Sequence, residues 1–245
     1  MVDARGHGRS EAPAQGYGPA EQADDLVGVI RELNLHGPAI LGHSMGAATT
    51  LVLAGTYPDV PGAILLEDPP GWWMASLEQE QAGEDNEPGA DIGAKIHGRD
   101  PAGEDPGAGL QTWFAGLKRK TRDELIAEQR AAAPNWSEEE LGPWADAKLR
   151  VSPHALNVFT GRPEATVDWP ATLRRITCPA LLITADTDRG AVLPQGAAAA
   201  LQTLVPHLRI AHIPGAGHNV RREQFDRFLE VVQAFLHESM PGRPG

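Results

Sequence analysis

A Gly-x-Ser-x-Gly pattern centred on Ser44 constrains the fold of this chain more than any other feature. Residues 38–41 read Pro-Ala-Ile-Leu, which is typical of a short buried strand, whereas the Ala- and Leu-rich residues 47–57 favour a buried helix. A strand, a sharp turn and a helix form the setting in which this pattern presents a serine nucleophile. We expect Gly42 and Gly46 to be small because strand and helix backbones approach closely there. The same letters without that setting are typical of a glycine-rich turn with an incidental serine.

Length and charge limit the class of protein. The 245 residues suffice for one α/β domain with an insertion and a sizeable core. The chain holds 21 basic and 33 acidic residues, and the resulting net charge of −12 argues against nucleic acid or an anionic membrane as partner. No stretch approaches the ~20 apolar residues of a membrane-spanning helix, and Met1-Val2-Asp3 does not resemble a secretory leader. We therefore expect a cytoplasmic protein that acts on a small molecule, with no metal and no cofactor.

A second motif lies at the beginning of the chain. Residues 3–10 read Asp-Ala-Arg-Gly-His-Gly-Arg-Ser, and this segment resembles the loop after the fourth strand of the alpha/beta-hydrolase family. In that family a helix and then the nucleophile strand follow this loop, and residues 19–35 indeed carry apolar side chains at helical spacing. The resemblance implies an α/β fold with a mostly parallel sheet flanked by helices.

The chain departs from the family before the fourth-strand loop. The resemblance implies three further strands there, and a His-Gly segment that supplies one of two backbone N–H donors to an oxyanion. His36-Gly37 and His97-Gly98 lie in other places and do not replace that segment. We expect an N-terminally truncated hydrolase fold that self-associates through the exposed edge of its nucleophile strand. The alternative is a natural short form that completes this edge in another way.

Composition divides the chain into three parts. Residues 1–70 form the first part of the hydrolase core and end in an apolar run, stopped by two prolines, that reads as the next parallel strand. Residues 71–167 lose strand signals and become acidic, rich in Gly and Pro and helical in patches. The resemblance identifies this insertion as a helical lid. Residues 168–245 resume the core with two apolar strands and an amphipathic closing helix.

All six tryptophans lie in or at the edges of the insertion. Bulky side chains there are typical of small helices that pack onto a body, and the alternative is an apolar roof over a hydrophobic substrate. Trp72, Trp73 and Met74 directly follow a strand end, which makes them the candidates for substrate binding.

The residues that acyl transfer requires follow one another in the order of the family. A serine nucleophile needs a base that takes its proton and an acid that orients the base. His218 lies in a Gly-Ala-Gly-His turn after the last strand, the context in which the family places its base. The N–H of Met45 is the expected oxyanion donor on the turn. We expect His43 to point away from the turn.

The acid has three candidate positions. The family pattern after the seventh strand, Gly-x-x-Asp, aligns Ala185 with the glycine and Asp188 with the acid, so Asp188 is the first choice. Some family members carry the acid after the sixth strand, which nominates Glu67 or Asp68. Asp186 would project differently from Asp188 and is otherwise read as a turn cap.

These residues together predict a lidded serine hydrolase that acts on a small, largely apolar ester, lactone or related carbonyl compound through an acyl-enzyme. Carbon–carbon bond hydrolysis and cofactor-free perhydrolysis use the same groups and stay open. A serine nucleophile argues against the epoxide and haloalkane branches, which use Asp. The rival is a non-catalytic or inactive hydrolase-fold fragment or a binding protein, because loss of an oxyanion donor costs about 10²- to 10³-fold in rate.

Overall fold

The computed structural model describes residues 1–82, 106–159 and 166–240. Its contacts divide the chain into two compact units. The smaller unit joins residues 1–18 to the described part of 98–163, and the larger unit holds the described parts of 19–97 and 164–245.

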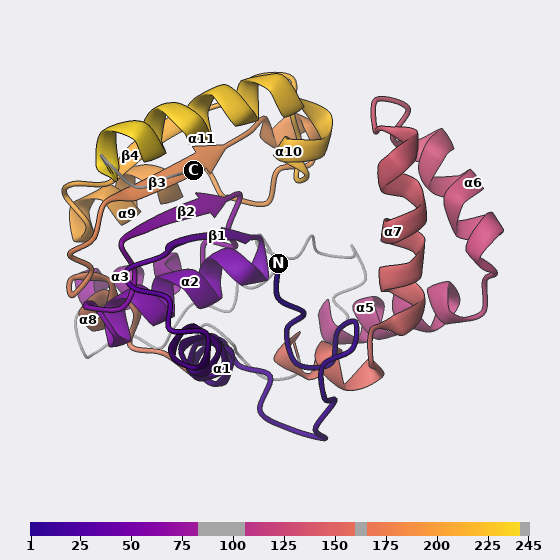
Figure 1. The fold of residues 1–245 in the computed structure, drawn as a ribbon, viewed down its shortest axis with the longest axis horizontal. Coiled ribbons are helices and arrows are strands. Elements are labelled where there is room, and N and C mark those ends of the chain that lie inside the picture. The colour runs from indigo at the N-terminus through magenta and orange to yellow at the C-terminus, as the bar shows by residue number, and fades with distance from the viewer. Residues whose placement is uncertain (83–105, 160–165, 241–245) are drawn as a thin grey trace. The chain divides into compact units, whose positions relative to one another are not determined.

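The larger unit is built on a parallel sheet (Figure 1). Its described strands are β1 (Ala39–His43), β2 (Ala63–Glu67), β3 (Ala180–Thr184) and β4 (Arg209–His212), in the order β1-β2-β3-β4. All the carboxyl ends therefore lie at one edge, where ligands of parallel α/β sheets usually bind. The predicted fold class, a mostly parallel sheet flanked by helices, is confirmed.

The burial of each strand reflects its position in the sheet. Every residue of β2 is buried, as is typical of a central parallel strand covered on both faces. Along β1 exposed and buried residues alternate, and Leu41 is 43% exposed. Among the described strands β1 thus lies at an edge of the sheet.

Helices cover both faces of this sheet. The amphipathic helix α11 places Phe228 and Phe235 against Leu65 and Leu181, whereas α2 packs against β1 and β2 from the other face (Figure 1). The helices of this unit are α1 (Pro19–Glu32), α2 (Met45–Thr56), α3 (Trp73–Ala82), α8 (Trp169–Leu173), α9 (Ala197–Leu204), α10 (Val220–Glu223) and α11 (Phe225–Ser239), with the 3₁₀ turn η3 (Thr187–Arg189).

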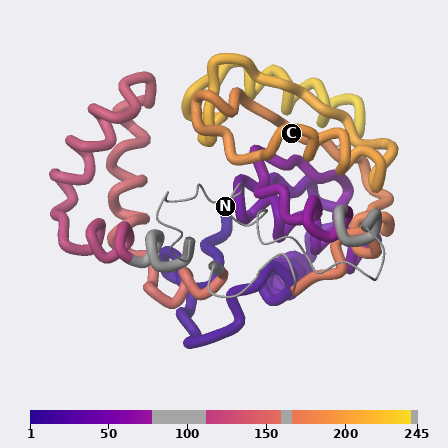
Figure 2. The backbone as a smooth tube through the Cα atoms, turned by 180° about the vertical axis from the view of Figure 1, so that it is seen from behind, coloured from indigo at the N-terminus to yellow at the C-terminus, as the bar shows by residue number. Residues whose placement is uncertain are grey.

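The described part of the smaller unit is helical. Helices α6 (Arg122–Ala132) and α7 (Glu138–Arg150) lie side by side as a hairpin (Figure 1, Figure 2). They follow α5 (Pro106–Lys118) and precede the 3₁₀ helix η1 (Pro153–Phe159). Thr121 and Glu124 form a capping box at the start of α6, which satisfies N–H groups that the helix itself leaves open.

The first residues of the chain pack in this smaller unit. The N–H of Ser152 donates to the Gly6 carbonyl at 2.7 Å, and the Asn157 amide donates to the Ala14 carbonyl at 3.0 Å. The Arg-Gly-His-Gly loop therefore belongs to the same compact unit as the helices of the insertion. Among the described helices of both units, none is long and apolar enough to cross a membrane.

Candidate active site

Ser44 lies on the turn between β1 and α2, as its pattern predicts. Its φ of 55° and ψ of −122° are unusual for a residue with a side chain, and such backbone strain costs about 1–3 kcal/mol and clusters at functional sites. The turn is held because the Ser44 N–H donates to the Glu67 carbonyl at 2.9 Å. A Cβ on Gly42 would lie 2.2 Å from the Gly46 carbonyl oxygen, so only glycine fits there.

The two glycines of the pattern are not equivalent. Gly42 meets the backbone of the turn, as expected, whereas a Cβ on Gly46 would meet none of the described atoms within 4 Å. Close approach thus explains the first glycine but not the second.

Met45 is the first residue of α2. The N–H groups of a first helical turn have no carbonyl partner inside the helix, and the Ser44 side chain does not cap them. The Met45 N–H adjoins the Ser44 side chain at the positive end of the helix dipole, which is a favourable place for an oxyanion.

The base predicted at residue 218 contacts the carboxylate of Asp68. The His218 Nδ1–H donates to Asp68 Oδ2 at 2.7 Å. The same carboxylate accepts the backbone N–H groups of Val192 at 2.8 Å and Leu193 at 3.0 Å. Asp68 is fully buried, and these N–H groups compensate the loss of water around its charge.

The carboxylate that contacts His218 in the structure is that of Asp68, not that of Asp188, which the sequence favoured. Asp188 lies in the exposed 3₁₀ turn η3, two residues further along than Asp186, and His218 faces Asp68 instead. The reason is backbone direction: Asp68 follows the central strand β2 at a φ of 40°, which turns its buried side chain toward the loop that carries His218.

Asp186 contacts the loop that precedes His218, not the His218 side chain. Its carboxylate accepts the Gly215 N–H at 2.7 Å and contacts His212 Nε2 at 3.0 Å. The hydrogen bond from Gly215 lowers the pKa of Asp186, with His212 adding to that effect. The alternative reading of Asp186 as a turn residue fits this arrangement.

Glu67, the other residue nominated after the sixth strand, is paired with an arginine. Its buried carboxylate accepts the Arg221 N–H at 3.0 Å and the Arg221 guanidinium at 2.8 Å. Burial raises the pKa of Glu67, and Arg221 opposes that shift. The pair ties β2 to α10, the helix that follows His218.

Glu223 and His43 also contact the His218 loop, and neither contact was predicted from the sequence. Glu223 accepts the N–H groups of Gly217 at 2.7 Å and Asn219 at 3.1 Å. His43 Nε2 lies 2.7 Å from the His218 carbonyl oxygen, so this side chain contacts the loop of the base, a contact that the sequence did not indicate. A carboxylate four residues after Asn219 was the only sequence signal for Glu223, and a histidine beside Ser44 was the only one for His43.

The tryptophans that follow β2 are buried in the larger unit. Trp72 and Trp73 are fully buried, and the Trp73 indole donates to the Ala197 carbonyl at 3.1 Å. The Trp72 ring lies 6.2 Å from that of Trp169. Met74 is half-buried at the start of α3. Substrate binding by these residues stays a prediction.

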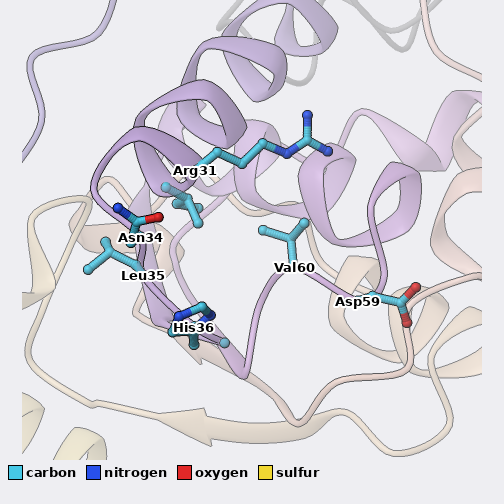
Figure 3. A pocket seen from close by; sticks show the side chains of 8 residues that line it. Arg31, Asn34, Leu35, His36, Asp59 and Val60 are labelled. Atoms are coloured by element: carbon cyan, nitrogen blue, oxygen red, sulfur yellow. The ribbon is translucent and has the colours of Figure 1, made fainter.

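A groove of about 480 Å³ lies in the larger unit but away from these residues (Figure 3). Its walls come from the end of α1, from residues 35–37 just before β1, and from Asp59 and Val60 just before β2. It therefore opens at the amino ends of the strands, opposite Ser44 and Asp68. Within the described ranges, no group of three or more His, Cys, Asp or Glu side chains is placed to hold a metal.

A parallel sheet with a strained serine turn and a His–Asp pair at its carboxyl edge defines an α/β protein, and this arrangement is typical of the alpha/beta-hydrolase fold. A sequence model of the alpha/beta hydrolase family matches residues 1–231, and the chain belongs to that family. It is an enzyme of the alpha/beta-hydrolase type.

Its relatives include enzymes named for different substrates. The 2-(acetamidomethylene)succinate hydrolase of Mesorhizobium japonicum is 26% identical over 235 residues, which cover 96% of this chain and 77% of the relative. The N-formylmaleamate deformylase of Pseudomonas putida is 25% identical over 238 residues, with coverage of 96% and 77%. The crystal structure of an N-formylmaleamic acid deformylase from Pseudomonas putida S16 has a TM-score of 0.68 at 24% identity and covers 94% of this chain and 79% of that one, which shows the shared fold.

Replacing the two glycines of the turn separates their roles. Gly42→Ala should lower stability by about 1–3 kcal/mol, because its Cβ must displace the Gly46 backbone. Gly46→Ala should leave stability unchanged or raise it by up to about 1 kcal/mol, since alanine suits a helix better than glycine. Thermal unfolding followed by circular dichroism measures both, and equal losses would contradict the asymmetry.

Removing Arg221 should expose the cost of a buried charge. Arg221→Ala leaves the Glu67 carboxylate without its cation and should cost about 3 kcal/mol, measured by urea unfolding. The loss should be smaller at about pH 5 than at about pH 8, because burial raises the pKa of Glu67 and the protonated carboxyl needs no cation. The control is Glu67→Gln combined with Arg221→Ala, which should be more stable than Arg221→Ala alone; a double variant that is less stable would refute this account.

Proposed function

We propose that this enzyme is a serine hydrolase in which Ser44 is the nucleophile, His218 the base and Asp68 the acid. The observation that carries the proposal is the 2.7 Å contact between His218 Nδ1 and the buried Asp68 carboxylate. With Nδ1–H held by Asp68, the other ring nitrogen, Nε2, carries the lone pair that can accept the Ser44 proton. The ring of His43, the residue before Ser44, lies 4.5 Å from the His218 ring, so base and nucleophile share one neighbourhood.

The reaction follows from these roles. Ser44 Oγ attacks the substrate carbonyl carbon while His218 Nε2 takes its proton, and the new oxyanion accepts the Met45 N–H. His218 then gives the proton to the leaving group, which departs as the carbonyl reforms and the acyl-enzyme remains. Water, deprotonated by His218, attacks that acyl group; the bond to Ser44 Oγ then breaks, His218 returns the proton to Oγ, and the acid product leaves. The Asp68 carboxylate stabilises the imidazolium that forms in each step.

The substrate is a small carbonyl compound. The sequence favours a largely apolar ester or lactone, and the names of the relatives add acylated nitrogen compounds that carry a carboxylate, such as N-formylmaleamate. Carbon–carbon bond hydrolysis and perhydrolysis begin from the same nucleophile and are distinguished by the products. Membership of an enzyme family and the paired His218 and Asp68 disfavour a pure binding protein. The cytoplasmic location stays a prediction from the sequence.

Covalent labelling tests the roles of these residues. A fluorophosphonate probe should add one adduct to the native chain and none to Ser44→Ala, as measured by intact mass. Asp68→Asn should slow labelling about 10²- to 10⁴-fold, because His218 loses the group that sets its tautomer. Asp188→Asn is the matched control and should label at the native rate.

Either of two results would overturn the assignment. If Asp188→Asn slows labelling and Asp68→Asn does not, Asp188 is the acid after all. If the folded native chain takes no adduct, Ser44 is not activated, and the inactive or binding alternative is favoured.

We also propose that the chain associates with a second copy of itself, in addition to binding its small-molecule substrate. The strand β1 lies at an edge of the described sheet and exposes Leu41, and unpaired strand edges promote association. Leu41→Lys should shift the chain toward monomer, because a charged side chain at a strand edge opposes pairing. Light scattering after gel filtration measures this, with Leu229→Lys on the exposed surface of α11 as the control. Monomeric native chain would contradict the proposal.

A further inference from the structure

We propose that His43 is a positioning residue for the base: its Nε2–H donates to the His218 carbonyl and holds the His218 imidazole in register with Ser44. This inference rests on the proposed roles of Ser44 and His218 and adds a residue to them. It is carried by two contacts, the 2.7 Å distance from His43 Nε2 to His218 O and the 4.5 Å distance between the two ring centroids, with the rings tilted by 42°.

The place of His43 in the fold suits this role. It is the last residue of β1 and pairs with Glu67 across the sheet, so its backbone is held by the parallel ladder. Ser44 follows it directly. The same rigid strand end therefore carries both the nucleophile and the side chain that holds the base. A shift of Ser44 would be accompanied by a shift of His43.

The His218 loop needs such a contact because its other anchors act elsewhere. Asp68 holds one atom of the imidazole, Nδ1, and a single hydrogen bond leaves the ring able to swing about it. Glu223 holds the N–H groups on either side, those of Gly217 and Asn219. The His43 contact restrains the carbonyl of His218 itself, and the His43 ring lies next to the His218 ring.

Charge supports the same role. Burial is the main cause that lowers the pKa of His43 to about 3, followed by repulsion from the His218 ring whenever that ring is protonated and from the Arg221 charge; the hydrogen bond to the His218 carbonyl opposes this shift, and Arg222 adds to it weakly. His43 is therefore neutral near pH 7, and its N–H must lie on Nε2, because a carbonyl oxygen only accepts. A neutral neighbour adds no positive charge beside His218 when that ring becomes an imidazolium during the reaction.

Three substitutions of His43 separate positioning from packing. His43→Gln keeps a donor that reaches the His218 carbonyl, whereas the amide of His43→Asn is too short. His43→Phe keeps the ring and loses the donor. With a p-nitrophenyl ester as substrate, kcat should fall about 10- to 100-fold in His43→Asn and His43→Phe, with KM changed by less than about threefold, because a misplaced base slows chemistry rather than binding. His43→Gln should recover to within about fivefold of the native kcat.

A readout that does not need turnover accompanies the kinetics. The proton between His218 Nδ1 and Asp68 should give a low-field proton resonance in the NMR spectrum, absent from His218→Gln. That resonance should persist in His43→Gln and broaden or disappear in His43→Asn and His43→Phe, while circular dichroism shows retained fold. This measurement decides the role of His43 whichever variants are active.

The outcomes distinguish the two proposals. Native kcat and a native low-field resonance in all three His43 variants would overturn the role of His43 and leave the assignment of Ser44, His218 and Asp68 intact. A loss that His43→Gln does not rescue would also overturn it, because packing and not the hydrogen bond would then be responsible. Absence of fluorophosphonate labelling on the native chain would instead contradict the proposed function, and the resonance would still report on the contact.

Discussion

The buried carboxylate of Asp68 is the interaction on which the candidate site depends. It joins the end of β2, the backbone at Val192 and Leu193, and the ring of His218. A carboxylate without exposure to solvent is costly unless its oxygens are hydrogen-bonded, and here three N–H groups meet that need. The requirement to satisfy this charge therefore brings together segments that lie more than a hundred residues apart in the sequence.

The parallel sheet supplies the rigidity that such an arrangement requires. Ser44 and Asp68 follow the neighbouring strands β1 and β2, and both have positive φ angles. Strained backbone persists only where the surroundings hold it, and the hydrogen bond from the Ser44 N–H to the Glu67 carbonyl extends the ladder between these strands into the turn. Glu67 and Arg221 then secure the helix that follows the base.

Short patterns predicted those parts of the site that depend on neighbouring residues. The strand, turn and helix around Ser44 and the glycine-rich turn before His218 are local, and the structure has both. The acid depends on distant residues. A family spacing favoured Asp188, but the side chain that meets His218 is set by the direction of the backbone after β2, and a spacing within one loop contains no information about that direction.

The sequence by itself determined the fold class, the family and the turn that presents Ser44, because apolar periodicity and glycine placement act over a few residues at a time. Only the tertiary structure decided that Asp68 faces His218, that Arg221 neutralises Glu67, and that His43 contacts the carbonyl of the base. Each of these contacts joins groups from separate strands and loops. Which groups meet is set by how the sheet aligns its carboxyl ends, and by the cost of burying a charge or a polar atom without a partner.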